Sequence, residues 1–147
     1  MKLKSPEFEN NQFIPDKFTC EGEDVNPELF IEDLPSEAKS LALIVEDPDS
    51  IKGNWVHWVV YNIAPVTRIE ENSIPGKEGI NDFGRKSYGG PCPLSGTHRY
   101  LFRLYALDAI LDLKEGLTKF ELERSIENRV LARAELIGLY QKKNKNK

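Results

Sequence analysis

The chain has 147 residues, of which 39% are hydrophobic, and a formal net charge of −4. This length predicts one domain, which buries roughly two-thirds of its unfolded surface and so forms a core of its own. Four lysines stand among the last six residues, so the residues before them carry a net charge of −8. Such an acidic body repels a phosphate backbone, which excludes duplex nucleic acid as an expected partner.

A cytoplasmic location is expected. No apolar stretch follows the first six residues, as a secretory signal requires, and no run of about 18 apolar residues would span a membrane. The two cysteines, Cys20 and Cys92, form no CxxC pair, and in a reducing compartment we expect both to be free thiols. A single disulfide between them is the alternative.

Extended segments dominate the first three-quarters of the chain. Apolar or alternating runs, each bounded by Pro, Gly, Asp or Asn, predict strands over residues 29–32, 41–46, 55–63 and 99–107. Short strands with turn-rich joins predict a mainly β fold with a sandwich-like or barrel-like core. The long turn-rich segments 47–54 and 72–96 are expected to be functional, because long loops in compact domains usually are.

One helix is predicted near the C-terminus. Residues 118–121 read as a capping box, and Leu122, Ile126 and Val130 follow as an apolar stripe. Residues 134–140 favour a return to extended structure. We expect one domain over residues 1–141, followed by a basic, disordered tail at 142–147.

The only two histidines, His57 and His98, stand on predicted strands. Alternation places Trp55 and His57 on one face of the first strand, with Val56, Trp58 and Val60 on the other. On the second strand His98 and Tyr100 share a face, opposite Arg99. If the two strands are neighbours, their histidines and aromatic rings line one small cavity. The plainer interpretation is that each histidine is a structural residue.

Each histidine follows one of the two unusual loops. Asp47 and Asp49 precede the first strand, and the glycines of Gly89-Gly90-Pro91-Cys92-Pro93 precede the second. Glycine lets backbone N–H groups approach an anion closely. The alternative is that the two aspartates only cap a turn. We expect Trp58 to be core, and Arg99 and Arg103 to be structural or surface residues.

These residues resemble the phosphatidylethanolamine-binding protein family, also called the Raf-kinase-inhibitor-like family, and its short prokaryotic branch in particular. The resemblance rests on Asp47-Pro48-Asp49 with Trp55-Val56-His57-Trp58 and on Tyr88-Gly89-Gly90-Pro91-Cys92-Pro93 with Gly96-Thr97-His98-Arg99-Tyr100. Further matching segments are Phe18-Thr19-Cys20-Glu21-Gly22 and Ala134-Glu135-Leu136-Ile137-Gly138-Leu139-Tyr140. Together these segments cover nearly the whole chain.

The resemblance implies a β-sandwich with a few peripheral helices and a small pocket for phosphate-like anions, phosphorylated head groups or phosphopeptides. Matching positions imply a lining of Asp47, Trp55, His57, His98 and Tyr100. They also imply a rim loop at Gly90 and Pro91, with Asp49 and Cys92 as supporting residues. The chain departs from the family pattern at Ser50-Ile51, where Ala-Pro is usual, and at Asn128-Arg129, where many members have Gly-His.

We therefore expect a regulatory, non-enzymatic binding module that needs no cofactor or metal. Its candidate partners are a small anionic or phosphorylated ligand and a protein kinase or protease, and a homodimer stays open. One rival function is serine protease inhibition by the 72–88 segment. The other is metal-dependent phosphoester hydrolysis by two histidines and a carboxylate, against which no compact ligand spacing such as HExxH is present.

Overall fold

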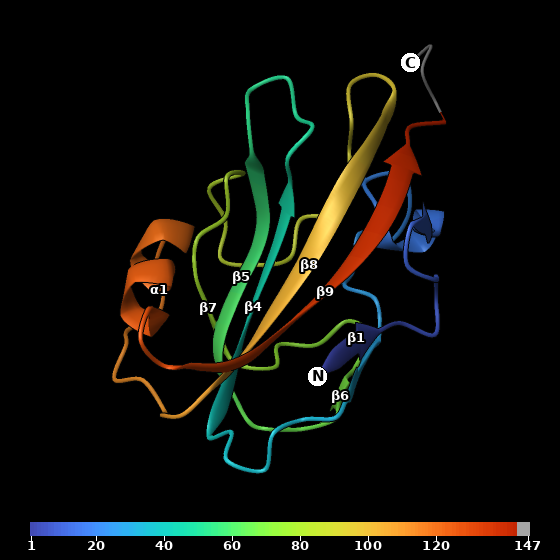
Figure 1. Ribbon diagram of the computed structural model, residues 1–147. Coiled ribbons are helices and arrows are strands. Elements are labelled where there is room, and N and C mark those ends of the chain that lie inside the picture. The colour runs from blue at the N-terminus through green and yellow to red at the C-terminus, as the bar shows by residue number, and fades with distance from the viewer. Residues whose placement is uncertain (144–147) are drawn as a thin grey trace.

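The computed structural model describes residues 1–143 (Figure 1). Its strands form a six-stranded sheet in the order β2-β9-β8-β4-β5-β7 and a three-stranded sheet in the order β1-β3-β6. The strands are β1 (Lys2–Lys4), β2 (Gln12–Phe13), β3 (Leu29–Glu32), β4 (Ser40–Asp47), β5 (Trp55–Ile63), β6 (Arg68–Ile69), β7 (Lys77–Glu78), β8 (Thr97–Leu107) and β9 (Val130–Gln141). The helices are a short 3₁₀ helix η1 (Asp16–Phe18) and α1 (Lys119–Ile126).

Each of the four predicted strands is present. β3 and β5 match the predicted ranges, and β4 and β8 begin one and two residues earlier than predicted. β4 is buried along its whole length because β8 pairs with one of its edges and β5 with the other, both antiparallel. A strand covered on both faces reads as a continuous apolar run, which explains the sequence of β4.

Two apolar clusters cover the two faces of the large sheet. The first lies between the sheets, where Leu3 and Ile31 of the small sheet join Val45 and Phe102 of the large one. The second lies under the helix and contains Ile44, Val59, Leu122 and Ile126. α1 and the small sheet accordingly lie on opposite sides of the large sheet (Figure 1). The predicted sandwich with a peripheral C-terminal helix is confirmed.

The capping box that marked the helix is present. The Thr118 hydroxyl accepts the Glu121 N–H at 3.2 Å, and the Glu121 carboxylate accepts the Thr118 N–H at 2.9 Å. The helix is shorter than the predicted stripe, because it ends at Ile126 and Val130 already begins β9.

A β-bulge in β5 changes the alternation that we predicted for this strand. Val45 pairs with Trp58, but its neighbour Glu46 pairs with Val56, so His57 is the extra residue. Trp58 consequently packs in the cluster between the sheets, whereas Val56 packs in the cluster under the helix. The prediction that Val56 shares a face with Trp58 and Val60 is wrong, because an extra residue reverses the phase of a strand.

The C-terminal end of β9 lies against η1. The Lys143 ammonium is 2.9 Å from the Asp16 carboxylate, and the Tyr140 hydroxyl donates to Glu21 at 2.7 Å. Of the predicted tail, residues 144–147 lie outside the described residues, so its disorder stays a prediction. Among residues 1–143, no helix combines the length and the apolar character that a membrane crossing needs.

Candidate functional site

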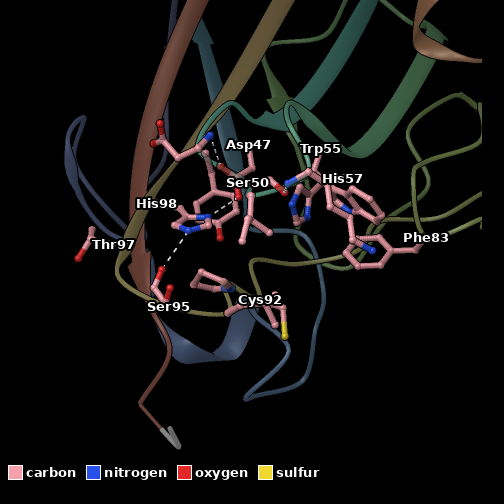
Figure 2. A pocket seen from close by; sticks show the side chains of 15 residues that line it. Asp47, Ser50, Trp55, His57, Phe83, Cys92, Ser95, Thr97 and His98 are labelled. Carbon is pink, nitrogen blue, oxygen red and sulfur yellow. Dashed lines mark hydrogen bonds and ion pairs between the residues drawn. The ribbon is translucent and has the colours of Figure 1, made fainter.

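A pocket of about 710 Å³ opens at one end of the large sheet, where β4 ends and β5 and β8 begin. The loop that joins β4 to β5 and the loop that precedes β8 extend from this same end (Figure 1). Figure 2 shows side chains from both loops and all three strands directed toward one space. The predicted lining residues that border it are Asp47, Trp55, His57, His98 and Tyr100, together with Asp49 and Cys92.

Asp47 and His98 form a buried pair in the wall of the pocket. His98 Nδ1 lies 2.7 Å from Asp47 Oδ2, and the other carboxylate oxygen accepts the Asp49 N–H at 2.8 Å. His98 Nε2 lies 3.1 Å from the Ser95 carbonyl oxygen. Because a carboxylate and a carbonyl only accept, a neutral ring satisfies one of these contacts and an imidazolium satisfies both. Asp47 therefore fixes the orientation of the His98 ring.

His57 is held from behind by the rim loop. Its Nδ1 lies 2.6 Å from the Gly89 carbonyl oxygen, which requires a proton on Nδ1 and leaves Nε2 as the second polar atom of the ring. Burial lowers the pKa of His57, since the side chain is only 3% exposed. At neutral pH the ring is uncharged, so Nε2 presents a lone pair.

Tyr100 stands between the two imidazoles. Its ring is 5.3 Å from that of His57 in an edge-on arrangement and 6.5 Å from that of His98 in a stacked one, measured between centroids. The side chain is fully buried, and burial raises the pKa of Tyr100, so the hydroxyl keeps its proton. The Cys92 amide lies near this hydroxyl, but no hydrogen bond of normal geometry is formed with any described residue. A buried hydroxyl in this state has an unused donor.

The second acid of the Asp-Pro-Asp motif is a structural partner. Asp49 accepts two hydrogen bonds of 2.9 Å from the Arg99 guanidinium and a third from the Arg99 backbone N–H. These bonds lower the pKa of Asp49 to about 2. The pair ties the 48–54 loop to β8, which supports the predicted roles of Asp49 as a supporting acid and of Arg99 as a structural residue.

Aromatic and apolar side chains form the rest of the mouth. Phe83 packs edge-on against both Trp55 and His57, with ring centroids 5.6 and 5.3 Å apart. Ile51 and Leu94, at the tips of the two loops, are 83% and 77% exposed. Sequence reasoning missed Phe83. The signal was an apolar residue inside the turn-rich run Asn81-Asp82-Phe83-Gly84, because such a residue often packs against other side chains.

The cysteines are joined, so the prediction of free thiols is wrong. Cys20 and Cys92 form a disulfide with a Cα–Cα distance of 5.5 Å between residues 72 apart in sequence. Cys92 lines the pocket, and its partner lies in the turn that follows η1. The disulfide therefore fixes the rim loop to the N-terminal part of the chain. The expected cytoplasmic location loses the support that free thiols would have given it.

Gly90 and Pro91, predicted as ligand-binding rim residues, do not border the pocket. Gly90 N–H donates to the Asp24 carboxylate at 2.7 Å, and the Pro91 carbonyl accepts the Cys20 N–H at 3.1 Å. A side chain at Gly90 would meet the Phe18 carbonyl oxygen at 2.4 Å. The glycine is needed for close contact between two loops, so its part in ligand binding stays a prediction.

Comparison with known proteins identifies the family. Residues 4–141 match the model of the family described as phosphatidylethanolamine-binding protein. This chain belongs to the phosphatidylethanolamine-binding protein family. The prediction made from its motifs is confirmed.

Relatives in this family cover almost the whole chain. A UPF0098 protein of Pyrococcus horikoshii is 49% identical over 97% of this chain and 78% of its own length. A UPF0098 protein of Methanothermobacter thermautotrophicus is 45% identical over 97% and 99%. These names state no activity.

Two solved structures of the phosphatidylethanolamine-binding protein family have the same fold. A homolog from Chlamydia trachomatis has a TM-score of 0.94 and 42% identity, with 97% of each chain covered. YbcL of Escherichia coli, described as a new member of the mammalian family, has a TM-score of 0.88 and 27% identity, with 97% of this chain and 98% of that chain covered. Within residues 1–143 of the present family member, no group of three or more His, Cys, Asp or Glu side chains is arranged to hold a metal ion.

Proposed function

We propose that this protein binds phosphate-like anions or phosphorylated small molecules and peptides in the pocket between His57 and His98, as a regulatory binding module and not as an enzyme. The observation that carries the proposal is the buried Tyr100 hydroxyl, which keeps its proton and has no hydrogen-bond partner among residues 1–143. An oxygen of a bound anion would accept that hydrogen bond and remove the cost of an unpaired buried donor.

The imidazoles would complete the anion site in different ways. His98, oriented by Asp47, would contribute positive charge when its ring is doubly protonated. His57 presents Nε2. In the neutral ring this atom would accept a hydrogen bond from a hydrogen phosphate, and in the protonated ring it would donate one. A charged imidazole contributes less as protons are removed, so phosphate affinity should decrease as the pH rises through about 7.

The state of Cys92 supports binding over turnover. Cys92, which precedes the histidine motif and borders the pocket, is held in a disulfide and has no thiolate to offer. The proposed partners are a small anionic or phosphorylated ligand and a protein kinase or protease. A cytoplasmic location and a homodimer are likewise open predictions.

Calorimetric titration with inorganic phosphate would test the proposal. We expect Tyr100→Phe, which removes only the hydroxyl, to weaken binding about tenfold, the usual loss for a charge-assisted hydrogen bond. Tyr105→Phe is the matched control, because Tyr105 lies on the same strand outside the pocket and should bind phosphate like the wild type. Wild-type protein without measurable phosphate binding, or equal binding by Tyr100→Phe, would refute the proposal.

The pH dependence provides an independent test of the same mechanism. Titrations between about pH 5.5 and 8.5 should show the affinity decreasing as the imidazoles lose protons. A constant affinity over that range would rule out a contribution from a protonated imidazole.

A further inference from the structure

The charged groups that border the pocket are paired with one exception. Asp47 faces His98 at 2.7 Å, and Asp49 faces Arg99 at 2.9 Å. His57 adds no charge at neutral pH, because burial lowers its pKa. Lys52, in contrast, has no carboxylate of the described residues within ion-pair distance, and it lines the same pocket. Its positive charge is therefore available to a ligand.

Local contacts keep Lys52 at the mouth. Its ammonium lies over the Trp55 ring, 5.6 Å from the centroid, which is a favourable cation–π distance. The Lys52 N–H donates to the Ser50 hydroxyl at 3.3 Å, and the Gly53 N–H donates to the Ser50 carbonyl at 3.0 Å. Gly53 has a φ of +87°, which closes this turn at little steric cost. Trp55 is itself a wall of the pocket, so the ammonium stands beside the space where an anion would bind.

The sign and number of these charges define which anions fit. A phosphomonoester carries a charge of about −1.5 to −2 at pH 7, whereas a diester carries about −1. The second negative charge would meet the Asp47 and Asp49 carboxylates if no unpaired cation were present. Lys52 supplies that cation at the open side of the pocket.

From this arrangement we infer that Lys52 makes the pocket selective for phosphomonoesters over phosphodiesters. The inference rests on the proposed anion-binding function and adds the class of phosphorylated ligand to it. Lys52 acts as a specificity-determining residue, because the contacts through Tyr100 and the histidines are available to both kinds of ester.

Methyl phosphate and dimethyl phosphate are the probes that separate the two classes. Dissociation constants are measured by NMR titration at about pH 7.5 and low salt, where surface charges are little screened. We expect the wild type to prefer the monoester by about fivefold or more, the size that one partly solvated ion contact provides. Lys52→Gln should lose that preference because its affinity for methyl phosphate decreases while its affinity for dimethyl phosphate does not change. Lys52→Arg should keep the preference.

Lys39→Gln is the matched control. Lys39 is exposed and directly precedes β4, whereas Asp47 stands at the other end of that strand. Lys39→Gln removes one positive charge, as Lys52→Gln does. If Lys39→Gln reduces the preference as much as Lys52→Gln, the effect is one of net charge and the inference is wrong. Equal affinities for both esters in the wild type would also overturn it, whereas failure of both to bind would refute the proposed function itself.

Discussion

His98 Nδ1 and Asp47 Oδ2 lie 2.7 Å apart although the residues are 51 positions apart in sequence. The pair connects the end of β4 to the start of β8, and its side chains are 5% and 14% exposed for Asp47 and His98. Because both groups are largely withdrawn from water, each depends on the other for its hydrogen bond. The orientation of the His98 ring is thus set by a contact between two strands, together with the Ser95 carbonyl of the loop before β8.

A double-mutant cycle would measure this dependence. We expect Asp47→Asn and His98→Asn each to lower the free energy of unfolding, since each leaves a buried polar group without its partner. The coupling between them should be about 1–3 kcal/mol in urea denaturation. Strictly additive losses would contradict the pairing.

The buried, neutral His57 makes stability depend on pH with a definite sign. Its pKa in the folded protein is lowered below the ordinary 6.5 by burial, so below that pH the unfolded state binds a proton that the folded state does not. The contribution of His57 to the free energy of unfolding should level off above about pH 6.5 and decrease by up to about 1.4 kcal/mol per pH unit below it.

His57→Gln is the comparison that isolates this contribution. The variant will be less stable at every pH, because the ring is packed between Tyr100 and Phe83. The informative quantity is the difference between the two denaturation series from about pH 5 to 8. A difference that does not change with pH would show that His57 has the same pKa in the folded and unfolded protein, and the opposite slope would show that the folded ring is charged.

The disulfide should contribute strongly to stability. Closing a loop between residues 72 apart removes conformational entropy from the unfolded chain, and Cys20→Ser with Cys92→Ser should lower the free energy of unfolding by about 4 kcal/mol. The same loss should appear when the wild type is reduced, and reductant should not affect the double variant. A thiol titration of the unfolded, unreduced wild type that finds two free thiols would show that the bond is absent.

Much of the site was predictable where the chain follows regular rules. β8 is an uninterrupted antiparallel strand, so simple alternation places His98 and Tyr100 on the pocket side and Arg99 on the other. The Asp-Pro-Asp and Gly-Thr-His-Arg-Tyr motifs predicted the family and, through it, the fold. These motifs stand at the two strand ends that meet at the pocket.

The features that sequence reasoning missed depend on long-range contacts. Nothing local to Cys20 or Cys92 shows that their loops meet, since their proximity is created by the packing of the 19–24 turn on the rim loop. Phe83 reaches the pocket through a turn that Asn81 holds by accepting the Phe83 and Arg85 N–H groups at 3.0 Å. Both were hidden in segments without periodicity.

The extra residue in β5 has a consequence for the composition of the pocket wall. His57 interrupts the pairing with β4, so the strand on its Trp55 side and the strand on its Trp58 side follow separate alternations. Because of this change of phase, Trp55 borders the pocket and Val56 packs under the helix. Deleting His57 would merge the two alternations, so Trp55 would turn away from the pocket and Val56 would leave the cluster under the helix. The register of this one strand end therefore decides which side chains a ligand meets.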